Sequence, residues 1–468
     1  QWECSNGFMI NEENGFLSIA SYETTTIFIL NKLLKFSKIS NRGQRESNLR
    51  YLKQCNINFE DPLKKVALQK LFVNSQVMLI YGAAGTGKTT LINYISNMMN
   101  QSKKLFLTKT HTALQNLERR IENPGLDSDF ISIDSFTKTI TLTDYDIVFV
   151  DECSTIDNRT MKRLLEKIDE STLLVLAGDI YQIESIDFGN WFYYAKDIIK
   201  TDGANVELLN TWRTDKKELK GLWDEVRKIQ PIITEKLAID GPFSADIGEE
   251  IFVSQDEDEI VLCLNYDGKF GLNNMNLYFQ NANTKSEVYT WAEWTFKVGD
   301  PVIFLDTKRS PILYNNLKGR IVDISKRDSA ILFTLDIDTI LTERQCRNES
   351  FEFVDVTDRG TRIRLEVIAS DDESAPEEER FKTIIPFQIA YAVSIHKAQG
   401  LEYNSVKIII PSYNAEKISH SIFYTAITRA KEKLKIFWSA ETMKAIVESF
   451  DKEKIGQRTL KFIEKKLE

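Results

Sequence analysis

Between residues 76 and 149, short apolar runs alternate with amphipathic stretches. The stretches that begin at Thr89 and Thr112 predict helices. The apolar runs there and further along the chain predict strands over residues 77–81, 104–108, 147–150, 173–177, 406–410 and 434–438. This alternation is typical of a parallel sheet with crossover helices. Because the last two strands lie far from the others, we expect an α/β protein with two parallel-sheet cores.

The pattern of hydrophobic and polar residues changes over residues 298–385. Short β-like runs at 301–305, 320–324, 330–337 and 362–368 are separated by Gly, Asp and Asn. They predict a small β domain inserted into the second core. Within it, residues 370–380 carry six carboxylates, which indicates a solvated loop.

Composition excludes several classes of protein. The 468 residues are 42% hydrophobic and 28% charged, so the chain is long and apolar enough for two to four globular domains. The net charge of −9 argues against a uniformly basic surface, but a local basic channel remains compatible with it. No run approaches the ~20 apolar residues of a membrane helix. The chain begins with Gln1 and not Met, which is compatible with a fragment of a longer protein.

The cysteines point to a reducing compartment. They are widely separated and include no C-x-x-C pair: Cys4, Cys55, Cys153, Cys263 and Cys346. This spacing indicates neither a zinc site nor a dense disulfide framework. We therefore expect a cytoplasmic protein.

The strongest chemical motif follows the first predicted strand. Residues 82–89 read GAAGTGKT, which satisfies G-x-x-x-x-G-K-[ST] between a strand and a helix. Such a loop binds nucleotide phosphates through backbone N–H groups and the helix N-terminus. The cofactors predicted are ATP and Mg²⁺, with Lys88 on the β/γ-phosphates and Thr89 on the metal. The expected nucleotide-binding residues are Gly82, Gly85, Gly87, Lys88, Thr89 and Thr90.

Two carboxylates and an amide follow later strands. Asp151 and Glu152 end the strand at 147–150, at the sheet edge where open α/β folds bind ligands. We expect Asp151 to hold Mg²⁺ and Glu152 to activate the attacking water. Gln182, in GDIYQ after the next strand, could contact both the γ-phosphate and a water, supported by Asp179.

The segments GAAGTGKTT, DECS and GDIYQ resemble motifs I, II and III of superfamily 1 helicases, especially the RecD-like and Dda-like branch of superfamily 1B. Three later segments, NTWRT, YAVSIHKAQGLE and YTAITRAK, resemble motifs IV, V and VI. The resemblance implies two RecA-like domains with an SH3-like β domain inserted in the second. It also implies an ATP-dependent DNA helicase that moves 5′ to 3′ on a single strand.

The resemblance assigns further roles. Arg213 and Arg429 would be arginine fingers delivered from the second core, and Glu402 would contact the ribose. The residues expected to contact the single strand are Thr108, Thr110, His111, Ser135, His396, Lys397 and Gln399. Aromatic candidates for base stacking are Phe136, Tyr181, Trp191 and Trp212.

The implied domain limits are 61–205 for domain 1A, 206–297 with 386–445 for domain 2A, and 298–385 for domain 2B. Residues 1–60 have no assigned role, and 446–468 are expected to form a C-terminal helix.

The chain departs from the family pattern at two places. Only about residues 119–130 are available for the strand-separating pin of domain 1B, so translocation is better supported than strong unwinding. The adenine-reading glutamine upstream of the P-loop is not clear, because Lys64 and Lys65 occupy the stretch where it is expected and Gln69 lies nearby.

Two alternatives stay open at this point. One is an RNA helicase of superfamily 1. The other is an ATP-gated switch subunit that controls a protein partner such as a nuclease.

Overall fold

The computed structural model describes residues 2–3, 9–13, 16–41, 43–55, 61–125, 127–138, 144–185, 187–239, 243–254, 256–284, 286–305, 310, 312–327, 329–369, 383–450 and 454–467. The chain divides into two compact units. The first comprises Gln1–Pro231, Ser419–Thr428 and Val447–Glu468, and the second comprises Ile232–Ile418 and Arg429–Ile446.

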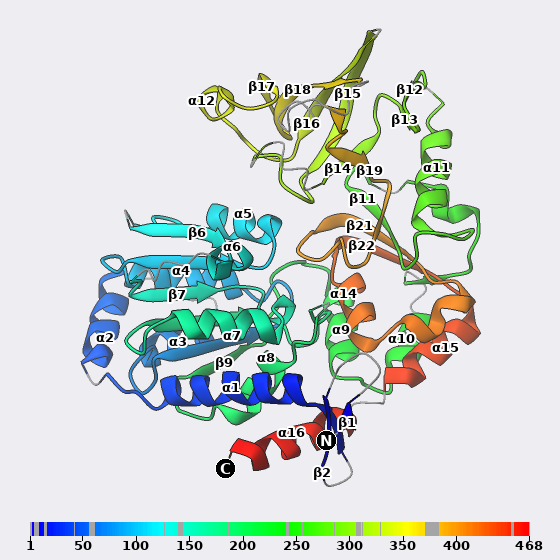
Figure 1. The fold of residues 1–468 in the computed structure, drawn as a ribbon. Helices are drawn as coiled ribbons and strands as arrows, with labels where there is room; N and C mark the ends of the chain where they lie inside the picture. Colours follow the sequence, from blue (N-terminus) through cyan, green and yellow to red (C-terminus); the bar gives the residue numbers. More distant parts are fainter. Residues whose placement is uncertain are drawn as a thin grey trace. The chain divides into compact units, whose positions relative to one another are not determined.

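The first unit is built on a six-stranded sheet in the order β6-β5-β7-β8-β4-β9, in which all neighbouring pairs are parallel (Figure 1). Its strands are β4 (Val77–Gly82), β5 (Lys104–Thr108), β6 (Ser128–Ser132), β7 (Ile147–Val150), β8 (Leu173–Gly178) and β9 (Asn205–Leu208). The four strands predicted in this region are confirmed. The sequence analysis missed β6 and β9, because both are edge strands whose polar residues break up the apolar run.

Side chains on the first sheet alternate between two helical layers. Leu79 packs in a cluster with α1, α7, α8 and α16, whereas Ile80 packs in a second cluster with α3 and α4. The helices of this unit are α1 (Ala20–Ser37), α2 (Gln44–Cys55), α3 (Pro62–Lys70), α4 (Lys88–Met98), α5 (His111–Arg120), α6 (Ile133–Lys138), α7 (Asn158–Lys167), α8 (Trp191–Ile198), α9 (Lys217–Arg227), α14 (His420–Ile427) and α16 (Lys454–Leu467). The sheet is therefore buried on both faces, as its nearly continuous apolar strands require.

The first 60 residues contribute to the first unit. Helix α1 lies against the sheet and packs on α7, α8 and α16. It follows a three-stranded antiparallel sheet of β1 (Trp2–Glu3), β2 (Met9–Glu13) and β3 (Phe16–Ile19). Helices α1 and α16 thus help to cover one face of the first sheet.

The second unit contains a five-stranded parallel sheet in the order β10-β22-β21-β11-β20. Its strands are β10 (Ser244–Ala245), β11 (Glu259–Cys263), β20 (Ala392–Ser394), β21 (Tyr403–Ile409) and β22 (Ala430–Phe437). Helix α11 (Leu272–Ala282) packs on this sheet through Leu272 and Met275. The second unit also includes α10 (Ile233–Ile239), and α15 (Ala440–Ser449) follows β22. The prediction of two parallel-sheet α/β cores is confirmed.

An antiparallel sheet is inserted between β11 and β20 of the second unit. Its order is β17-β18-β16-β15-β14-β19, with its own apolar core. Its strands are β14 (Pro301–Phe304), β15 (Lys318–Arg327), β16 (Ala330–Ile337), β17 (Glu352–Thr357), β18 (Gly360–Ile368) and β19 (Phe387–Ile389). The description of this sheet as SH3-like stays a prediction, and the acidic run at 370–380 lies outside the described residues.

The remaining short elements are the hairpin of β12 (Tyr289–Trp291) and β13 (Trp294–Phe296), helix α12 (Glu343–Cys346), and the 3₁₀ turns η1 (Cys153–Thr155), η2 (Glu249–Phe252) and η3 (Ser412–Lys417). Residues 121–125 and 127, which connect α5 to β6, form neither a helix nor a strand. The segment expected to hold the pin is therefore shortened at both ends by α5 and β6. Within the described parts of the chain, no helix is both long and apolar enough to span a bilayer.

A buried ion pair ties the parallel sheet of the second unit together, and it gives a stability prediction. The Lys407 Nζ donates to Glu259 Oε1 at 2.7 Å and to the carbonyls of Ile251 and Val253, and its side chain is 0% exposed. We expect Lys407→Met to lower the free energy of unfolding by about 3 kcal/mol, because the Glu259 charge stays buried without its cation. Urea unfolding measures the change.

Lys433→Met on the neighbouring strand is the matched control, since that side chain is exposed and its loss is expected to shift the transition by less than about 0.5 kcal/mol. Adding Glu259→Gln to Lys407→Met should recover part of the loss. Equal unfolding midpoints for Lys407→Met and the wild type would contradict the assignment.

Candidate functional site

Six strands of the first sheet end at one edge, and this edge collects the predicted motifs of the first unit. In the order of the sheet, the strand ends lead to Ser135 after β6, to His111 after β5, to Glu152 after β7, to Gln182 after β8 and to the P-loop after β4. The edge is therefore divided. The residues predicted to bind phosphate follow β8 and β4. The residues predicted to bind the nucleic-acid strand follow β6 and β5, and motif II follows β7, which lies between these two pairs of β-strands.

The P-loop joins β4 to α4 through a tight turn that needs glycine. Gly85 and Gly87 have φ values of +75° and +85°, and Gly87 is the N-cap of α4. A Cβ at Gly85 would lie 2.2 Å from the Cβ of Arg213, so this position has no room for a side chain. The turn therefore leaves the backbone N–H groups at the N-terminus of α4, where a phosphate binds favourably.

The predicted metal ligands lie together. The Thr89 hydroxyl donates to Asp151 Oδ2 at 3.3 Å, although the two residues are far apart in sequence. A hydroxyl and a carboxylate beside a phosphate-binding loop fit Mg²⁺, which is usually bound by one or two carboxylates together with substrate phosphates. No cluster of three or more His, Cys, Asp or Glu that could hold a metal occurs among the described residues.

Lys88, which is partly buried, and the buried carboxylates of Asp151 and Asp179 form a charge cluster. The Lys88 Nζ donates to the carbonyls of Gly82 and Ala83 at 2.8 and 3.0 Å. Burial lowers the pKa of Lys88, and the negative charges of Asp179 and Asp151 oppose that effect. Burial also raises the pKa of both carboxyl groups, against the opposing charge of Lys88. An ammonium group in this setting suits a highly charged anion such as a triphosphate.

Glu152 has a strained backbone. Its φ and ψ are 55° and 42°, in the left-handed region that non-glycine residues rarely adopt. Its N–H donates to Asp151 Oδ1 at 2.8 Å, and its carbonyl accepts from the Thr155 hydroxyl at 2.8 Å. These bonds fix the turn after β7. Strain of this kind is found at functional sites, where the surrounding structure holds it in place.

Gln182 is held by its neighbour in motif III. Its Nε2 donates to Asp179 Oδ2 at 3.2 Å, and the other oxygen of Asp179 accepts from the Tyr181 N–H at 3.1 Å. In turn, the Ile183 N–H donates to the Thr425 hydroxyl at 2.9 Å. The turn after β8 therefore connects the charge cluster to helix α14, which carries part of motif VI.

Arg213 lies elsewhere than expected. The sequence predicted an arginine delivered from the second core, but Arg213 belongs to the first unit. The reason is β9, which pairs with β4 and brings the following segment to the P-loop. The Trp212 N–H donates to the Gly85 carbonyl at 2.7 Å, and Arg213 donates to the Thr428 carbonyl at 2.7 Å. The positive charge of Arg213 also contributes to lowering the pKa of Lys88.

Arg429 and Glu402 lie in the second unit. Arg429 is 1% exposed and donates to the Leu401 carbonyl at 3.2 Å. Glu402 forms an ion pair with Lys431 at 3.4 Å. The structure thus keeps motif V and the end of motif VI beside each other, and the roles of Arg429 as a finger and of Glu402 on the ribose stay predictions.

The residues of the first unit that are predicted to bind the nucleic-acid strand differ in their solvent exposure and in their hydrogen bonds. Thr110 is the N-cap of α5 and accepts from the Ala113 N–H, and the Thr108 hydroxyl donates to the Thr110 carbonyl at 2.8 Å. Thr108 is 0% exposed, so its hydroxyl shapes the turn. His111 and Ser135 are exposed at the starts of α5 and α6. These two side chains are accessible to a ligand.

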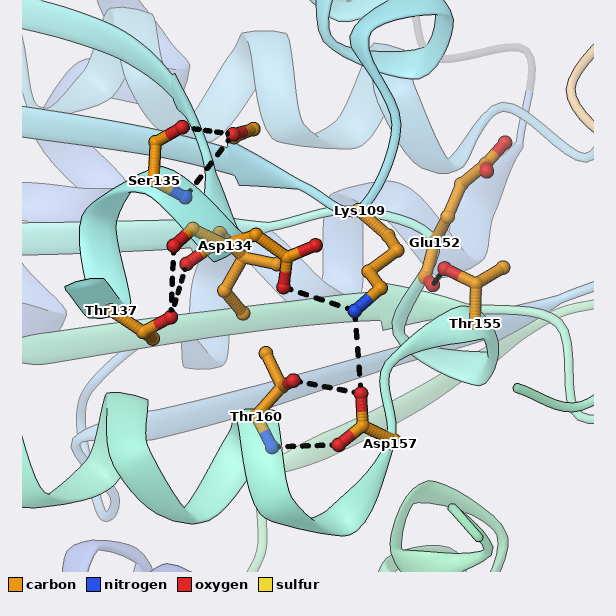
Figure 2. A network of polar contacts seen from close by, with 10 residues as sticks. Lys109, Asp134, Ser135, Thr137, Glu152, Thr155, Asp157 and Thr160 are labelled. Atoms are coloured by element: carbon orange, nitrogen blue, oxygen red, sulfur yellow. Dashed lines mark hydrogen bonds and ion pairs between the residues drawn. The ribbon is translucent and has the colours of Figure 1, made fainter. Parts of the chain in front are cut away.

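A polar network joins these turns to motif II (Figure 2). Lys109 Nζ lies between Asp134 and Asp157, at 3.0 and 3.3 Å. Burial by itself would lower the pKa of Lys109, but the hydrogen bonds and charges of the two carboxylates raise it above its ordinary value. Asp157 caps α7 through Thr160 and follows the motif II turn directly. Lys109 lies in the segment 108–111 that resembles motif Ia, but its pairing with Asp134 of α6 and with Asp157, the N-cap of α7, could not be predicted from the sequence.

In the second unit, His396 is exposed and follows β20. Lys397 and Gln399 are partly buried, and Lys397 Nζ donates to Gln388 Oε1 at 3.0 Å. Burial lowers the pKa of Lys397. The three residues predicted from motif V therefore lie in one turn, with His396 the most accessible of them.

Two of the four predicted stacking aromatics belong to the core. Trp191 is 0% exposed and donates to the Ile156 carbonyl at 2.8 Å, and Phe136 is 7% exposed in the same cluster. Both rings fill the layer between α6, α8 and the sheet, so neither candidate is available for stacking on a base. Tyr181 is partly buried, whereas Trp212 is 48% exposed next to the P-loop.

Two protein-family models match the chain. Residues 64–239 match an AAA domain, and residues 389–436 match a UvrD-like helicase C-terminal domain. The RecD subunit of the RecBCD enzyme from Buchnera aphidicola (subsp. Acyrthosiphon pisum) is 22% identical, over 82% of this chain and 74% of that protein. The corresponding subunit from Haemophilus influenzae is 20% identical, over 85% of this chain and 73% of that protein. These matches support a RecD-like helicase of superfamily 1B that hydrolyses ATP.

Solved structures give a weaker likeness. The crystal structure of Bacteroides Pif1 bound to ssDNA has a TM-score of 0.49 and 16% identity, over 82% of this chain and 94% of that chain. The Pif1 helicase from Candida albicans has a TM-score of 0.48 and 15% identity, over 83% and 98%.

Proposed function

We propose that this RecD-like helicase binds single-stranded DNA and moves along it 5′ to 3′, using ATP hydrolysis. The observation that carries the proposal is the division of the sheet edge of the first unit. The residues proposed to bind the nucleotide follow β4 and β8, and those proposed to contact the DNA strand follow β5 and β6. The motif II turn follows β7, between the two groups. The Lys109 network connects that turn to the strand-contact side.

On the nucleotide side, each residue has a separate task. Lys88 and the N–H groups of the P-loop bind the phosphates, and Thr89 and Asp151 hold Mg²⁺, which when bound neutralises charge on the β- and γ-phosphates. Glu152 orients the attacking water and accepts its proton. Arg213, which lies against Gly85, offers a guanidinium suited to the charge on the γ-phosphoryl group.

Trp212 is better placed to stack on the base of the nucleotide than on a base of the DNA strand. Its backbone is bonded to Gly85 while nearly half of its side chain is exposed, so an aromatic surface is available beside the phosphate-binding loop. We infer that Trp212 stacks on the base of the nucleotide, and that strand stacking in the first unit falls to other residues.

On the strand side, His111 and Ser135 are accessible at the starts of two helices, and His396 is accessible in the second unit. Hydroxyl and imidazole groups of this kind bind phosphates and sugars without reading sequence. Movement 5′ to 3′ is inferred from the family, and the short connection from α5 to β6 favours translocation over strong unwinding.

A protein partner is a second element of the proposal. The curated relatives from Buchnera aphidicola and Haemophilus influenzae are named as subunits of a larger enzyme, RecBCD. We propose that this helicase also works with a partner protein, such as a nuclease, whose activity its nucleotide state controls. The cytoplasmic location inferred from the cysteines stays a prediction.

The test is steady-state ATP hydrolysis at low salt with no nucleic acid, with single-stranded DNA and with single-stranded RNA, since phosphate contacts weaken as salt rises. We expect DNA to stimulate hydrolysis strongly. A matched displacement assay uses streptavidin on either end of the DNA strand, and movement 5′ to 3′ removes it only from the 3′ end. Stimulation by RNA alone would make the protein an RNA helicase, and indifference to both polymers would favour the partner-controlled switch.

A further inference from the structure

Lys109 joins the strand-binding side of the first sheet to the turn that carries motif II. It lies in the turn between β5 and α5, two residues before His111. Its Nζ is 3.0 Å from Asp134 Oδ1 and 3.3 Å from Asp157 Oδ2. Asp134 belongs to α6 and directly precedes Ser135, whereas Asp157 is the N-cap of α7. One ammonium group therefore bridges three segments, two of which carry residues proposed to contact the DNA strand.

The Asp157 carboxylate is fixed in place by several hydrogen bonds. It is 5% exposed, and besides Lys109 it accepts from the N–H of Thr160 at 2.8 Å and from the hydroxyl of Thr160 at 2.7 Å. Burial by itself would raise the pKa of Asp157, but the hydrogen bonds from Thr160 and the charge of Lys109 lower it below its ordinary value. The carboxylate thus stays charged at neutral pH, and a buried charge needs the cation beside it. The contact between Lys109 and Asp157 is therefore a firm connection.

A short hydrogen-bonded turn connects Asp157 to Glu152 (Figure 2). The Glu152 carbonyl accepts from both the N–H and the hydroxyl of Thr155, at 2.9 and 2.8 Å. The Ile156 N–H in turn donates to the Cys153 carbonyl at 3.1 Å. These bonds close the 3₁₀ turn η1, which has Glu152 at one end and Asp157 just beyond the other. A displacement of Asp157 would therefore reach the backbone of Glu152, which already adopts a strained left-handed conformation.

We propose that Lys109 is a positioning residue that couples binding of the DNA strand to hydrolysis of ATP. A strand bound at His111 and Ser135 shifts the turn after β5 together with helix α6. Lys109 passes this shift to Asp157, and the η1 turn passes it to the Glu152 carboxylate. Lys109 itself contacts neither the strand nor the nucleotide, because two carboxylates already engage its ammonium group. The inference rests on the proposed function, and it explains how a strand on one side of the sheet edge accelerates hydrolysis on the other.

The test compares Lys109→Met with Lys35→Met in the full chain. Lys35 forms an ion pair with Glu170, which precedes β8 at the opposite edge of the sheet, so this variant controls for the loss of a lysine and of an ion pair. Steady-state hydrolysis of ATP gives kcat without DNA and with saturating single-stranded DNA, and fluorescence anisotropy gives the Kd for the strand.

We expect Lys109→Met to lower the DNA-stimulated kcat by about tenfold, which lies within the range of about 5- to 150-fold that coupling between two sites typically produces. Its kcat without DNA and its Kd for the strand should stay within about threefold of the wild type, because the substitution removes the connection and not a contact with either ligand. Lys35→Met should match the wild type in all three quantities.

Asp157→Asn tests the same connection from its other end. Asparagine caps a helix as well as aspartate does, so the start of α7 is retained while the charge that holds Lys109 is lost. We expect this variant to lose stimulation as Lys109→Met does. The double variant should lose no more than either single variant, because all three break one contact, and multiplied losses would contradict the inference. Since the double variant has no uncompensated charge at position 157, it also decides the matter if Lys109→Met alone does not fold.

The remaining outcomes separate this inference from the proposed function. If single-stranded DNA does not stimulate hydrolysis by the wild type, the proposed function itself fails. If DNA stimulates the wild type and Lys109→Met equally, only the role of Lys109 is overturned. An equal drop in kcat with and without DNA would make Lys109 a support of the motif II turn and would also overturn the coupling. A higher Kd for the strand, with a salt dependence reduced by about one phosphate contact and an unchanged kcat at saturating DNA, would make Lys109 a strand-binding residue instead.

Discussion

Lys88→Ala is expected to reduce ATP turnover to the background rate while the protein stays folded. Lys88 Nζ is held by two P-loop carbonyls and lies in a charge cluster with Asp151 and Asp179. It is the cation placed to stabilise the charge that develops on the β- and γ-phosphates during phosphoryl transfer. Its removal would leave two buried carboxylates near the phosphates, so repulsion adds to the lost attraction.

The measurement is steady-state ATP hydrolysis in the presence of single-stranded DNA, with the melting temperature recorded for each variant. Lys200→Ala is the matched control, because Lys200 is an exposed lysine of the same unit outside the predicted motifs. We expect the control to keep wild-type turnover. Unchanged hydrolysis in Lys88→Ala would refute the assignment of the P-loop.

Local sequence was sufficient wherever a motif and its strand are contiguous. The P-loop, Asp151 and Gln182 each follow a short apolar run, and the carboxyl ends of parallel strands meet at one edge. For that reason their proximity could be predicted. The bond between Thr89 and Asp151 is a direct result of it.

The rest depended on which strands pair at the edges and on how helices pack. Strand β9 is short and partly polar, so its pairing with β4 was missed, and Arg213 was placed on the wrong core. Trp191 looked like an accessible aromatic only because the burial of α8 is a tertiary property. The contacts of Lys109 with Asp134 and Asp157 join three segments and have no local signature.

Glu152→Gln is expected to lower kcat by about 10³-fold with little change in nucleotide affinity. The substitution keeps the size and hydrogen-bonding reach of the side chain but removes the carboxylate that accepts a proton from water, and general bases contribute about 10²- to 10⁴-fold. Pre-steady-state binding of ADP measures the change in nucleotide affinity, and steady-state hydrolysis of ATP measures the change in kcat. Glu118→Gln, at an exposed position on α5, is the control and should not change kcat.

The backbone of Glu152 provides an independent check on this role. A left-handed conformation costs a non-glycine residue of the order of 1 kcal/mol or more, and glycine adopts it without that cost. If the carboxylate is retained for catalysis, Glu152→Gly should inactivate the protein while its unfolding midpoint stays equal to or above that of the wild type. A large drop in stability together with lost activity would instead mean that the Glu152 side chain mainly supports the turn after β7. A rise in KM with unchanged kcat in Glu152→Gln would likewise make Glu152 a binding residue and move the base elsewhere.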